Sequence, residues 1–143
     1  MYKNKEGYPD PVMGEVMSKM MREYRQNRKA TCARQHKLKN RQKIYVVSPY
    51  AGDTARNTEL AISYCQYVIE KGKMPVASHL LYPQMLDDDD PDEREMGRMF
   101  GLALLAVCHE VWGFGKNITD GMKEEIAEAE RLNIPVRYIE RIR

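Results

Sequence analysis

Apolar residues recur with two spacings along the chain, and each spacing predicts a different kind of element. Four short runs of mostly apolar residues have the length of strands, at residues 44–47, 74–77, from Val111 onward and at 134–139. The first run, Ile-Tyr-Val-Val, has no alternation with polar residues, which is typical of a strand buried on both faces of a sheet. We expect these runs to pair as the sheet of one domain.

Helical patterns fill the stretches between the predicted strands. One helix is expected from Thr54 to about Lys71, a second begins at Asp90 and Pro91, and a third begins at Thr119 or Asp120. Strands and helices thus alternate. Because crossovers between parallel strands are right-handed, this order predicts an α/β fold with a parallel sheet flanked by helices. The predicted buried stripe of the second helix comprises Met96, Met99, Phe100, Ala103, Leu104 and Val107.

A different pattern, over residues 1–42, precedes this predicted domain of residues 43–143. Asp10 and Pro11 mark the start of a helix, which we expect to end near Asn27, and residues 25–43 are interpreted as a basic linker. The apolar stripe of this helix is rich in methionine, which packs adaptably. It could dock on its own domain, on a second copy or on another protein, and docking within the same assembly is favoured. The stripe comprises Val12, Met13, Val16, Met17, Met20, Met21 and Tyr24.

Length and composition limit the class of protein. A chain of 143 residues with 43% hydrophobic and 31% charged residues is typical of one globular domain. Its longest apolar run is too short to cross a bilayer, and its first residues lack the apolar core of a signal peptide. We therefore expect a cytoplasmic protein without a membrane partner. Cys32, Cys65 and Cys108 are widely spaced and odd in number, which argues against a disulfide framework and a zinc site.

The net charge of +2 conceals an asymmetry between the two parts of the chain. Residues 1–43 carry 12 Lys and Arg against 4 Asp and Glu, whereas the remaining 100 residues carry 11 against 17. The basic stretch could bind nucleic acid through phosphates, but without interleaved aromatic residues a solvated linker is favoured. The acidic run from Asp87 to Asp90 lacks the pattern of a calcium-binding loop, so we expect no metal there.

The sharpest candidate for chemistry follows the third predicted strand. Gly113 and Gly115 allow a sharp turn, and Glu124 and Glu125 stand in what we expect to be the first turn of the next helix. The partial positive charge of a helix N-terminus keeps a carboxylate ionised and oriented, as a nucleophile or base requires. Glutamate at this place more often only stabilises the helix. The residues by themselves allow both interpretations.

Two further loops should reach the same edge of the sheet, because ligands of parallel α/β domains bind beyond the carboxyl ends of the strands. The loop at 48–53 could present backbone N–H groups to a phosphate or sugar, or it could form an ordinary capped turn. The apolar loop after the second strand presents His79 and Tyr82 as its polar groups. A lone histidine is more often structural than catalytic, and both interpretations apply to His79.

Several segments, taken together, carry a resemblance. They are Ile-Tyr-Val-Val-Ser-Pro-Tyr at 44–50 with Asn57, His-Leu-Leu-Tyr-Pro-Gln at 79–84, Asp-Pro-x-Glu-Arg-Glu at 90–95, and Trp-x-Phe-Gly at 112–115 followed by Gly-Met-x-x-Glu-x-x-x-Ala at 121–129. In these segments the chain from Lys43 to Ile139 resembles the nucleoside 2-deoxyribosyltransferase-like superfamily. Within it, the chain is similar to a phage and prophage branch of the DUF4406 and DUF7768 type.

This resemblance implies a flavodoxin-like, nucleoside deoxyribosyltransferase-like domain whose glutamate nucleophile attacks the anomeric carbon of a deoxyribonucleoside. Here that residue is Glu125, since it lies four residues after Gly121 and four before Ala129. A glycosyl-enzyme intermediate would then pass to another base or to water, without a metal or cofactor. The expected ligand-binding residues are Ser48, Pro49, Tyr50, Asp53, Asn57, His79, Tyr82, Gly113, Phe114, Gly115, Thr119, Asp120, Gly121 and Met122.

One position departs from the pattern of the superfamily. The established transferases have an aspartate two residues before the glycine of the last segment, where this chain has Thr119, and Asp120 follows one step later. The group that protonates the leaving base is therefore in question. Our first hypothesis is an enzyme that cleaves or exchanges the N-glycosidic bond of a nucleoside or nucleotide. The second is a non-catalytic binder of a nucleotide or ADP-ribose derivative, such as a phage counter-defence protein, and the third and weakest is a nucleic-acid accessory protein.

Self-association is also predicted. The methionine-rich first helix and the helix at 91–107, which is notched by Gly97 and Gly101, offer more apolar surface than a small domain usually leaves bare. We therefore expect a homodimer or a higher homo-oligomer, and the pattern leaves open which helix makes the contact.

Overall fold

The computed structural model describes residue 3, residues 5–8 and residues 10–142. The described chain divides into two compact units, one up to Asn40 and the other from Arg41 onward. Each unit is described by itself below. Among the described residues, no helix has both the length and the apolar character that crossing a bilayer would need.

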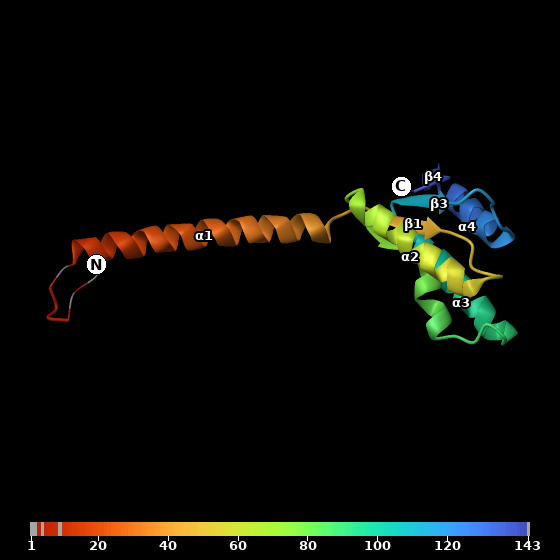
Figure 1. The fold of residues 1–143 in the computed structure, drawn as a ribbon, viewed down its shortest axis with the longest axis horizontal. Helices are drawn as coiled ribbons and strands as arrows, with labels where there is room; N and C mark the ends of the chain where they lie inside the picture. Colours follow the sequence, from red (N-terminus) through yellow and green to blue (C-terminus); the bar gives the residue numbers. More distant parts are fainter. Residues whose placement is uncertain (1–2, 4, 9, 143) are drawn as a thin grey trace. The chain divides into compact units, whose positions relative to one another are not determined.

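The first unit contains one long helix, α1, which spans Pro11–Lys39 (Figure 1). It begins where the sequence predicts, because the side chain of Asp10 caps it by accepting a hydrogen bond from the Met13 N–H at 3.0 Å. The predicted end near Asn27 and the basic linker are wrong, since the helix continues to Lys39. The apolar stripe ends at Tyr24, but the helix does not. The residues that follow it contain no glycine or proline, and Arg, Lys, Gln and Ala all favour a helix.

The second unit is an α/β domain, as the sequence predicts. Its four strands form one sheet in the order β2-β1-β3-β4, and every neighbouring pair is parallel. The strand β2 forms one edge, with Pro75 in its middle. The elements are β1 (Lys43–Val47), α2 (Thr54–Glu70), β2 (Met74–Val76), the 3-10 turns η1 (Ser78–Leu80) and η2 (Tyr82–Gln84), α3 (Pro91–Ala106), β3 (Glu110–Phe114), α4 (Asp120–Arg131) and β4 (Val136–Ile139).

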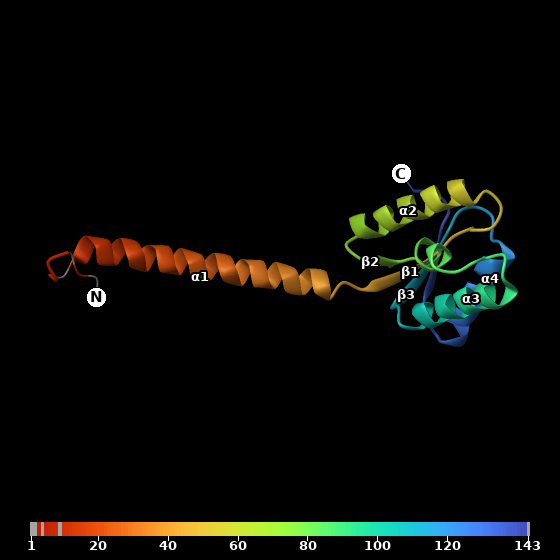
Figure 2. The ribbon, with the colours of Figure 1, turned by 90° about the horizontal axis from the view of Figure 1, so that it is seen from below.

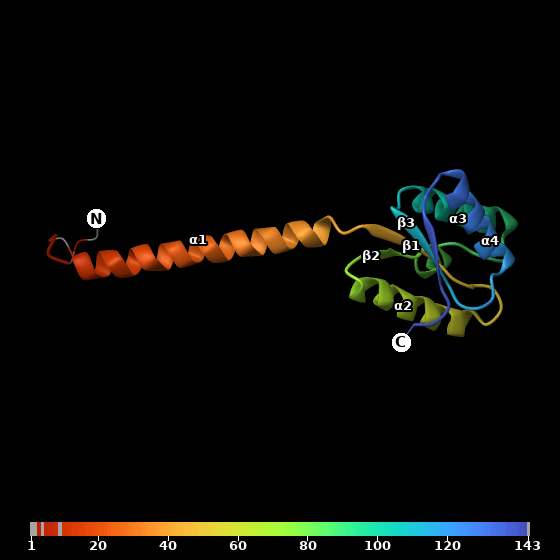
Figure 3. The same ribbon diagram turned by 90° about the horizontal axis from the view of Figure 1, so that it is seen from above.

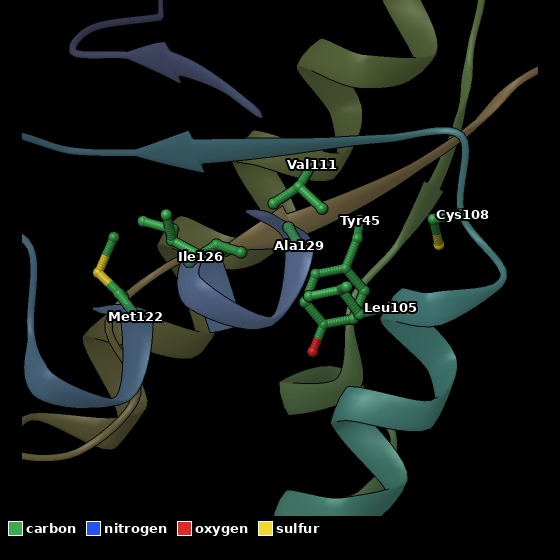
Figure 4. Packing of buried hydrophobic residues seen from close by; sticks show 8 residues of the cluster. Tyr45, Leu105, Cys108, Val111, Met122, Ile126 and Ala129 are labelled. Atoms are coloured by element: carbon green, nitrogen blue, oxygen red, sulfur yellow. The ribbon is translucent and has the colours of Figure 1, made fainter. Parts of the chain in front are cut away.

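Helices cover both faces of the sheet, because its central strands are apolar on both sides. Alternate residues of a strand point to opposite faces. Ile44 and Val46 of β1 pack in the core beneath α2, whereas Tyr45 and Val47 pack in the core beneath α3 and α4. Figures 2 and 3 show α2 on one side of the strands and α3 and α4 on the other. Figure 4 shows the second core from close by, with Tyr45 pointing toward Leu105.

The predicted buried stripe of α3 is wrong in its phase. Met96, Met99 and Phe100 are each more than 40% exposed, while Gly101 and Leu105 are the buried residues of the helix. The reason is the close approach of α3 to β1. A Cβ atom at position 101 would lie 3.3 Å from both the Ser78 Oγ and the Tyr45 hydroxyl oxygen, which is a tight contact, so this side of the helix carries its smallest residue. The larger apolar side chains consequently face outward.

This phase can be tested by truncating Leu105 of α3 and, as the exposed control, Val107 of the predicted stripe. Leu105→Ala should lower the free energy of unfolding by about 2–5 kcal/mol, because Leu105 is fully buried and its removal leaves a cavity. Val107→Ala, at a 65% exposed position just after the helix, should change it by less than about 0.5 kcal/mol. Urea unfolding followed by circular dichroism measures both. Equal losses would contradict the observed phase.

Candidate active site

A pocket of about 160 Å³ opens beside the loops that follow β1 and β2, and α3 and α4 complete its wall. It lies within the second unit, near the carboxyl ends of the strands, where parallel α/β domains bind ligands. Four of the residues expected from the sequence line it, namely Tyr50, His79, Tyr82 and Glu125. The other lining residues are Ser78, Pro83, Leu86, Asp88, Glu93, Arg94, Gly97 and Arg98.

Glu125 reaches the pocket because it lies on the side of α4 that packs against the sheet. Met122 and Ala129 are buried, and Glu125 lies three residues after the first and four before the second. Residues at these spacings share one face of a helix. Thr119 caps the N-terminus of α4, because its Oγ1 accepts a hydrogen bond from the Met122 N–H at 3.3 Å. The two glutamates therefore stand in the second turn of α4, one turn later than the sequence pattern suggests.

Burial dominates the electrostatics of Glu125. Its side chain is 14% exposed, and removal from water raises the pKa of the carboxyl to about 7. The nearby Tyr45 hydroxyl opposes this shift of the Glu125 pKa, and the charge of Glu124 adds to it. The expectation that the helix N-terminus holds Glu125 fully ionised is thus wrong, because the helix dipole acts mainly within the first turn. One carboxylate oxygen, Oε2, is buried and has no hydrogen-bond partner among the described residues.

Tyr45 and Ser78 support the floor of this pocket, and the sequence interpretation missed both. The Tyr45 hydroxyl and the Ser78 Oγ are 2.7 Å apart and share a hydrogen bond. Burial, followed by the charge of Glu125, raises the pKa of Tyr45 well above its ordinary value, so its hydroxyl keeps its proton. A signal was present in the sequence, since Tyr45 is the one polar-tipped side chain in the run Ile-Tyr-Val-Val. A buried tyrosine hydroxyl needs a partner.

His79 lies beside the Glu125 carboxylate, with 3.7 Å between its Nε2 and Oε1. Its ring stacks on the Tyr50 ring, with centroids 5.0 Å apart and planes 12° from parallel. Burial lowers the pKa of His79, and the charge of Asp88 opposes that shift. The ring is therefore mostly neutral at pH 7. The loops after β1 and β2 thus meet at this stack, which places an aromatic surface next to the carboxylate.

The wall formed by α3 carries charged side chains that the predicted site does not include. Arg98 forms an ion pair with Glu124 of α4 and another, at 3.6 Å, with Glu95. Arg94 lines the pocket one turn before Arg98, and Glu93 stands next to it. The sequence contained a signal for this wall. Arg94, Gly97 and Arg98 are three and four residues apart and therefore lie on one face of the helix.

Several expected ligand-binding residues support the pocket without lining it. Asn57 donates hydrogen bonds from Nδ2 to the backbone oxygens of Tyr50 at 3.1 Å and Ala51 at 3.2 Å, which holds the loop that carries Tyr50. Asp53 caps α2 by accepting from the Arg56 N–H at 3.2 Å. Ser48 is buried, and Pro49 lies beside it in the same loop.

The residues around the start of α4 are also outside the pocket lining. Gly113 is a paired residue of β3 and does not form the turn expected of it, whereas Gly115 does so with a φ of +97°. Phe114 stacks on Tyr64 in the core beneath α2. Asp120 is fully exposed, and its Oδ1 lies 3.9 Å from the Nζ of Lys123. Gly121 is exposed and Met122 is a core residue, so a ligand-binding role for these positions stays a prediction.

Within residues 10–142 and the few described residues before them, no three His, Cys, Asp or Glu side chains gather closely enough to hold a metal ion. The pocket therefore offers a carboxylate, a neutral imidazole and charged groups on its α3 wall as its polar chemistry.

Comparison with known proteins places the domain in a family. Residues 42–139 match the family described as Domain of unknown function (DUF7768). The chain belongs to this family. No curated protein matches the sequence. Among solved structures, the DUF7768 domain is similar to a 2-deoxyribosyltransferase from the psychrotolerant bacterium Bacillus psychrosaccharolyticus. The two share 18% sequence identity with a TM-score of 0.56, over 67% of this chain and 70% of that one, which establishes a common fold.

The burial of Glu125 predicts a pH-dependent gain in stability when its charge is removed. The pKa of Glu125 is higher in the folded chain than its ordinary value, so the folded state binds this proton more tightly and stability falls as pH rises from about 4.5 to 7. Ionising the buried group costs at most roughly 3 kcal/mol. Glu125→Gln should therefore raise Tm by several degrees at pH 8 and by much less at pH 5.

The neighbouring residue supplies the control for this measurement. Glu124 is 37% exposed and paired with Arg98, so Glu124→Gln should not stabilise the protein at pH 8. Thermal unfolding of the three proteins at both pH values, followed by circular dichroism, decides the matter. A gain for Glu125→Gln that is the same at pH 5 and pH 8 would show that its carboxyl has an ordinary pKa.

Proposed function

We propose that this DUF7768 domain cleaves or exchanges the N-glycosidic bond of a nucleoside or nucleotide, with Glu125 as the nucleophile. The observation that carries the proposal is the Glu125 carboxylate itself. It is buried on the apolar face of α4, it lines the pocket, and its Oε2 atom has no hydrogen-bond partner among the described residues. A carboxylate that is largely removed from water and has one unpaired oxygen costs stability, and such a cost is typical of a group that acts on a ligand.

The dimensions of the pocket favour a sugar at its centre. A volume of about 160 Å³ is below the roughly 300–1,000 Å³ of sites that enclose a drug-sized molecule. A pentose fits beside Glu125, whereas a base or a phosphate would extend toward the opening. The Tyr50 and His79 rings provide a flat apolar surface for a base, and Arg94 provides positive charge for a phosphate.

The reaction would proceed in two displacements at the anomeric carbon. First, Glu125 forms a bond to this carbon while the N-glycosidic bond breaks, and the base leaves with the electron pair and takes up a proton. Second, water or the nitrogen of another base attacks the same carbon, which releases the Glu125 carboxylate and a proton. The His79 imidazole lines the pocket and its Nε2 lies 3.7 Å from the Glu125 Oε1, so we assign it to these proton transfers.

A specific observation favours a second candidate, a non-catalytic binder of nucleotides or ADP-ribose derivatives. Thr119 is occupied in capping α4, and Asp120 points to solvent, so neither offers an acid to a leaving base. The pocket would then hold an intact ligand, as a phage-encoded counter-defence protein that sequesters a nucleotide signal would do.

One assay separates the two candidates. The protein is incubated with nucleosides, nucleoside monophosphates and ADP-ribose derivatives, and freed base is measured by chromatography. We expect release of base that falls by about 10³-fold or more in Glu125→Gln and changes less than about tenfold in Glu124→Gln. Recovery of intact ligand after denaturation, without freed base in any sample, would exclude the enzyme and support the binder.

The pH profile gives an independent check on the nucleophile. Glu125 must be ionised to attack, and its pKa is raised to about 7. The value of kcat/KM should therefore increase about tenfold per pH unit up to about 7 and become constant above it. A profile that is flat between pH 5 and 8 would mean that Glu125 does not act as the nucleophile.

A further inference from the structure

The helix α1 has no packing partner within the described part of its own unit. It has 29 residues, about 44 Å at 1.5 Å per residue, and none of them is buried. Most of the stability of a protein helix comes from packing its apolar face. Val12, Met13, Val16, Met20 and Met21 are each at least 45% exposed along one side of α1. A helix of this kind is expected to pack its apolar face against another surface.

We propose that α1 forms a parallel coiled coil with α1 of a second copy of this chain, with Met13, Met17, Met20 and Tyr24 in the seam. This inference does not depend on the proposed glycosidic chemistry. A coiled coil needs apolar residues at alternating steps of three and four, which are the a and d positions of a seven-residue repeat. The residues of the proposed seam follow these steps without interruption.

Beyond Tyr24, the a and d positions of the helix are mostly polar. With Met13 at a d position, the following a and d positions are Met17, Met20, Tyr24, Asn27, Thr31, Arg34 and Leu38. The positions from Met13 to Tyr24 are apolar or aromatic, and Leu38 closes the series. Asn27 is a residue type that fixes register when it stands in a seam. Arg34 is unfavourable there, because it would face the same arginine of the second copy.

The flanking positions select the parallel orientation. In a parallel pair, the g residue of one helix meets the e residue five positions later in the other. This brings Glu23 next to Arg28 of the second copy, an opposite-charge pair, and Val16 next to Met21 of the second copy. An antiparallel pair that stacks Met17 on Met20 instead places Val16 beside Glu23. It also leaves the positions after Tyr24 without a counterpart.

The basic residues of α1 do not favour nucleic acid as the occupant of this stripe. Residues 25–39 contain six Lys and Arg and no acidic residue. Arg25, Arg28 and Lys29 are three and four residues apart and share one side of the helix, but this side lies beside the apolar stripe, so a phosphate backbone bound there would leave the stripe itself uncovered. In the coiled coil most of these charges face solvent, and their mutual repulsion limits its stability.

Disulfide trapping in the full-length chain tests the contact and its orientation. Cys32→Ser is combined with Met20→Cys at the seam or, as the matched control, with Arg22→Cys on the outer face. We expect Met20→Cys to give a disulfide-linked dimer under mild oxidation, because d positions face each other in a parallel pair, and Arg22→Cys to give little. Circular dichroism confirms that both variants are folded.

The same approach can overturn the proposal. If Met20→Cys does not crosslink to itself, but a mixture of Met17→Cys and Met20→Cys chains forms mixed dimers, the helices are antiparallel. If neither sample crosslinks above the Arg22→Cys control, α1 does not pair with itself, and its apolar stripe packs on another surface.

Arg34 supplies a quantitative test by analytical ultracentrifugation. Arg34→Leu should tighten self-association about tenfold, because it replaces two facing charges in the seam with apolar side chains. Lys29→Leu, on the outer face, should leave the Kd nearly unchanged. Raising the salt concentration from 50 to 500 mM should also tighten association of the unmodified chain, since salt screens the repulsion. Equal effects of the two substitutions, or weaker association in salt, would contradict the parallel pair.

Discussion

The carboxyl group of Glu125 lies on the side of α4 that faces the sheet, between positions that are occupied by buried apolar side chains. Removing such a group from water favours its neutral form, and the protein opposes this cost only in part. The Tyr45 hydroxyl stands close enough to lower its pKa, and the His79 imidazole is 3.7 Å away, yet the Oε2 atom remains without a partner among the described residues. The chain therefore keeps an ionisable group in this position at the expense of its own stability.

The surroundings of this carboxylate explain the composition of the neighbouring elements. The Tyr45 hydroxyl and the Ser78 Oγ lie close against α3, and a Cβ at position 101 would come within 3.3 Å of both, so the close approach of α3 to β1 is eased by the glycine there. The larger apolar residues of α3 are thereby turned outward. The close packing of α3 against β1 therefore accounts both for the exposed apolar side chains of α3 and for the polar pair of Tyr45 and Ser78 beside the pocket.

The sequence predicts the order of strands and helices, because this order follows from local periodicity, whereas Glu125 is singled out only by the resemblance. It does not predict the phase of α3, since the same pattern of apolar residues is compatible with burying either Met96 and Phe100 or Gly101 and Leu105. The raised pKa of Glu125 and the bond between Tyr45 and Ser78 depend on contacts between distant segments. The length of α1 was underestimated because the end of an apolar stripe was equated with the end of a helix.

The short outer strand β2 has a consequence for how molecules of this protein can associate. Pro75 stands at its centre and lacks the N–H group that an additional strand would need for pairing. An incoming strand would find only three residues there, with the ladder interrupted in the middle. Continuous extension of the sheet from one molecule to the next is thus blocked at that border, a device that protects parallel sheets from fibrous aggregation.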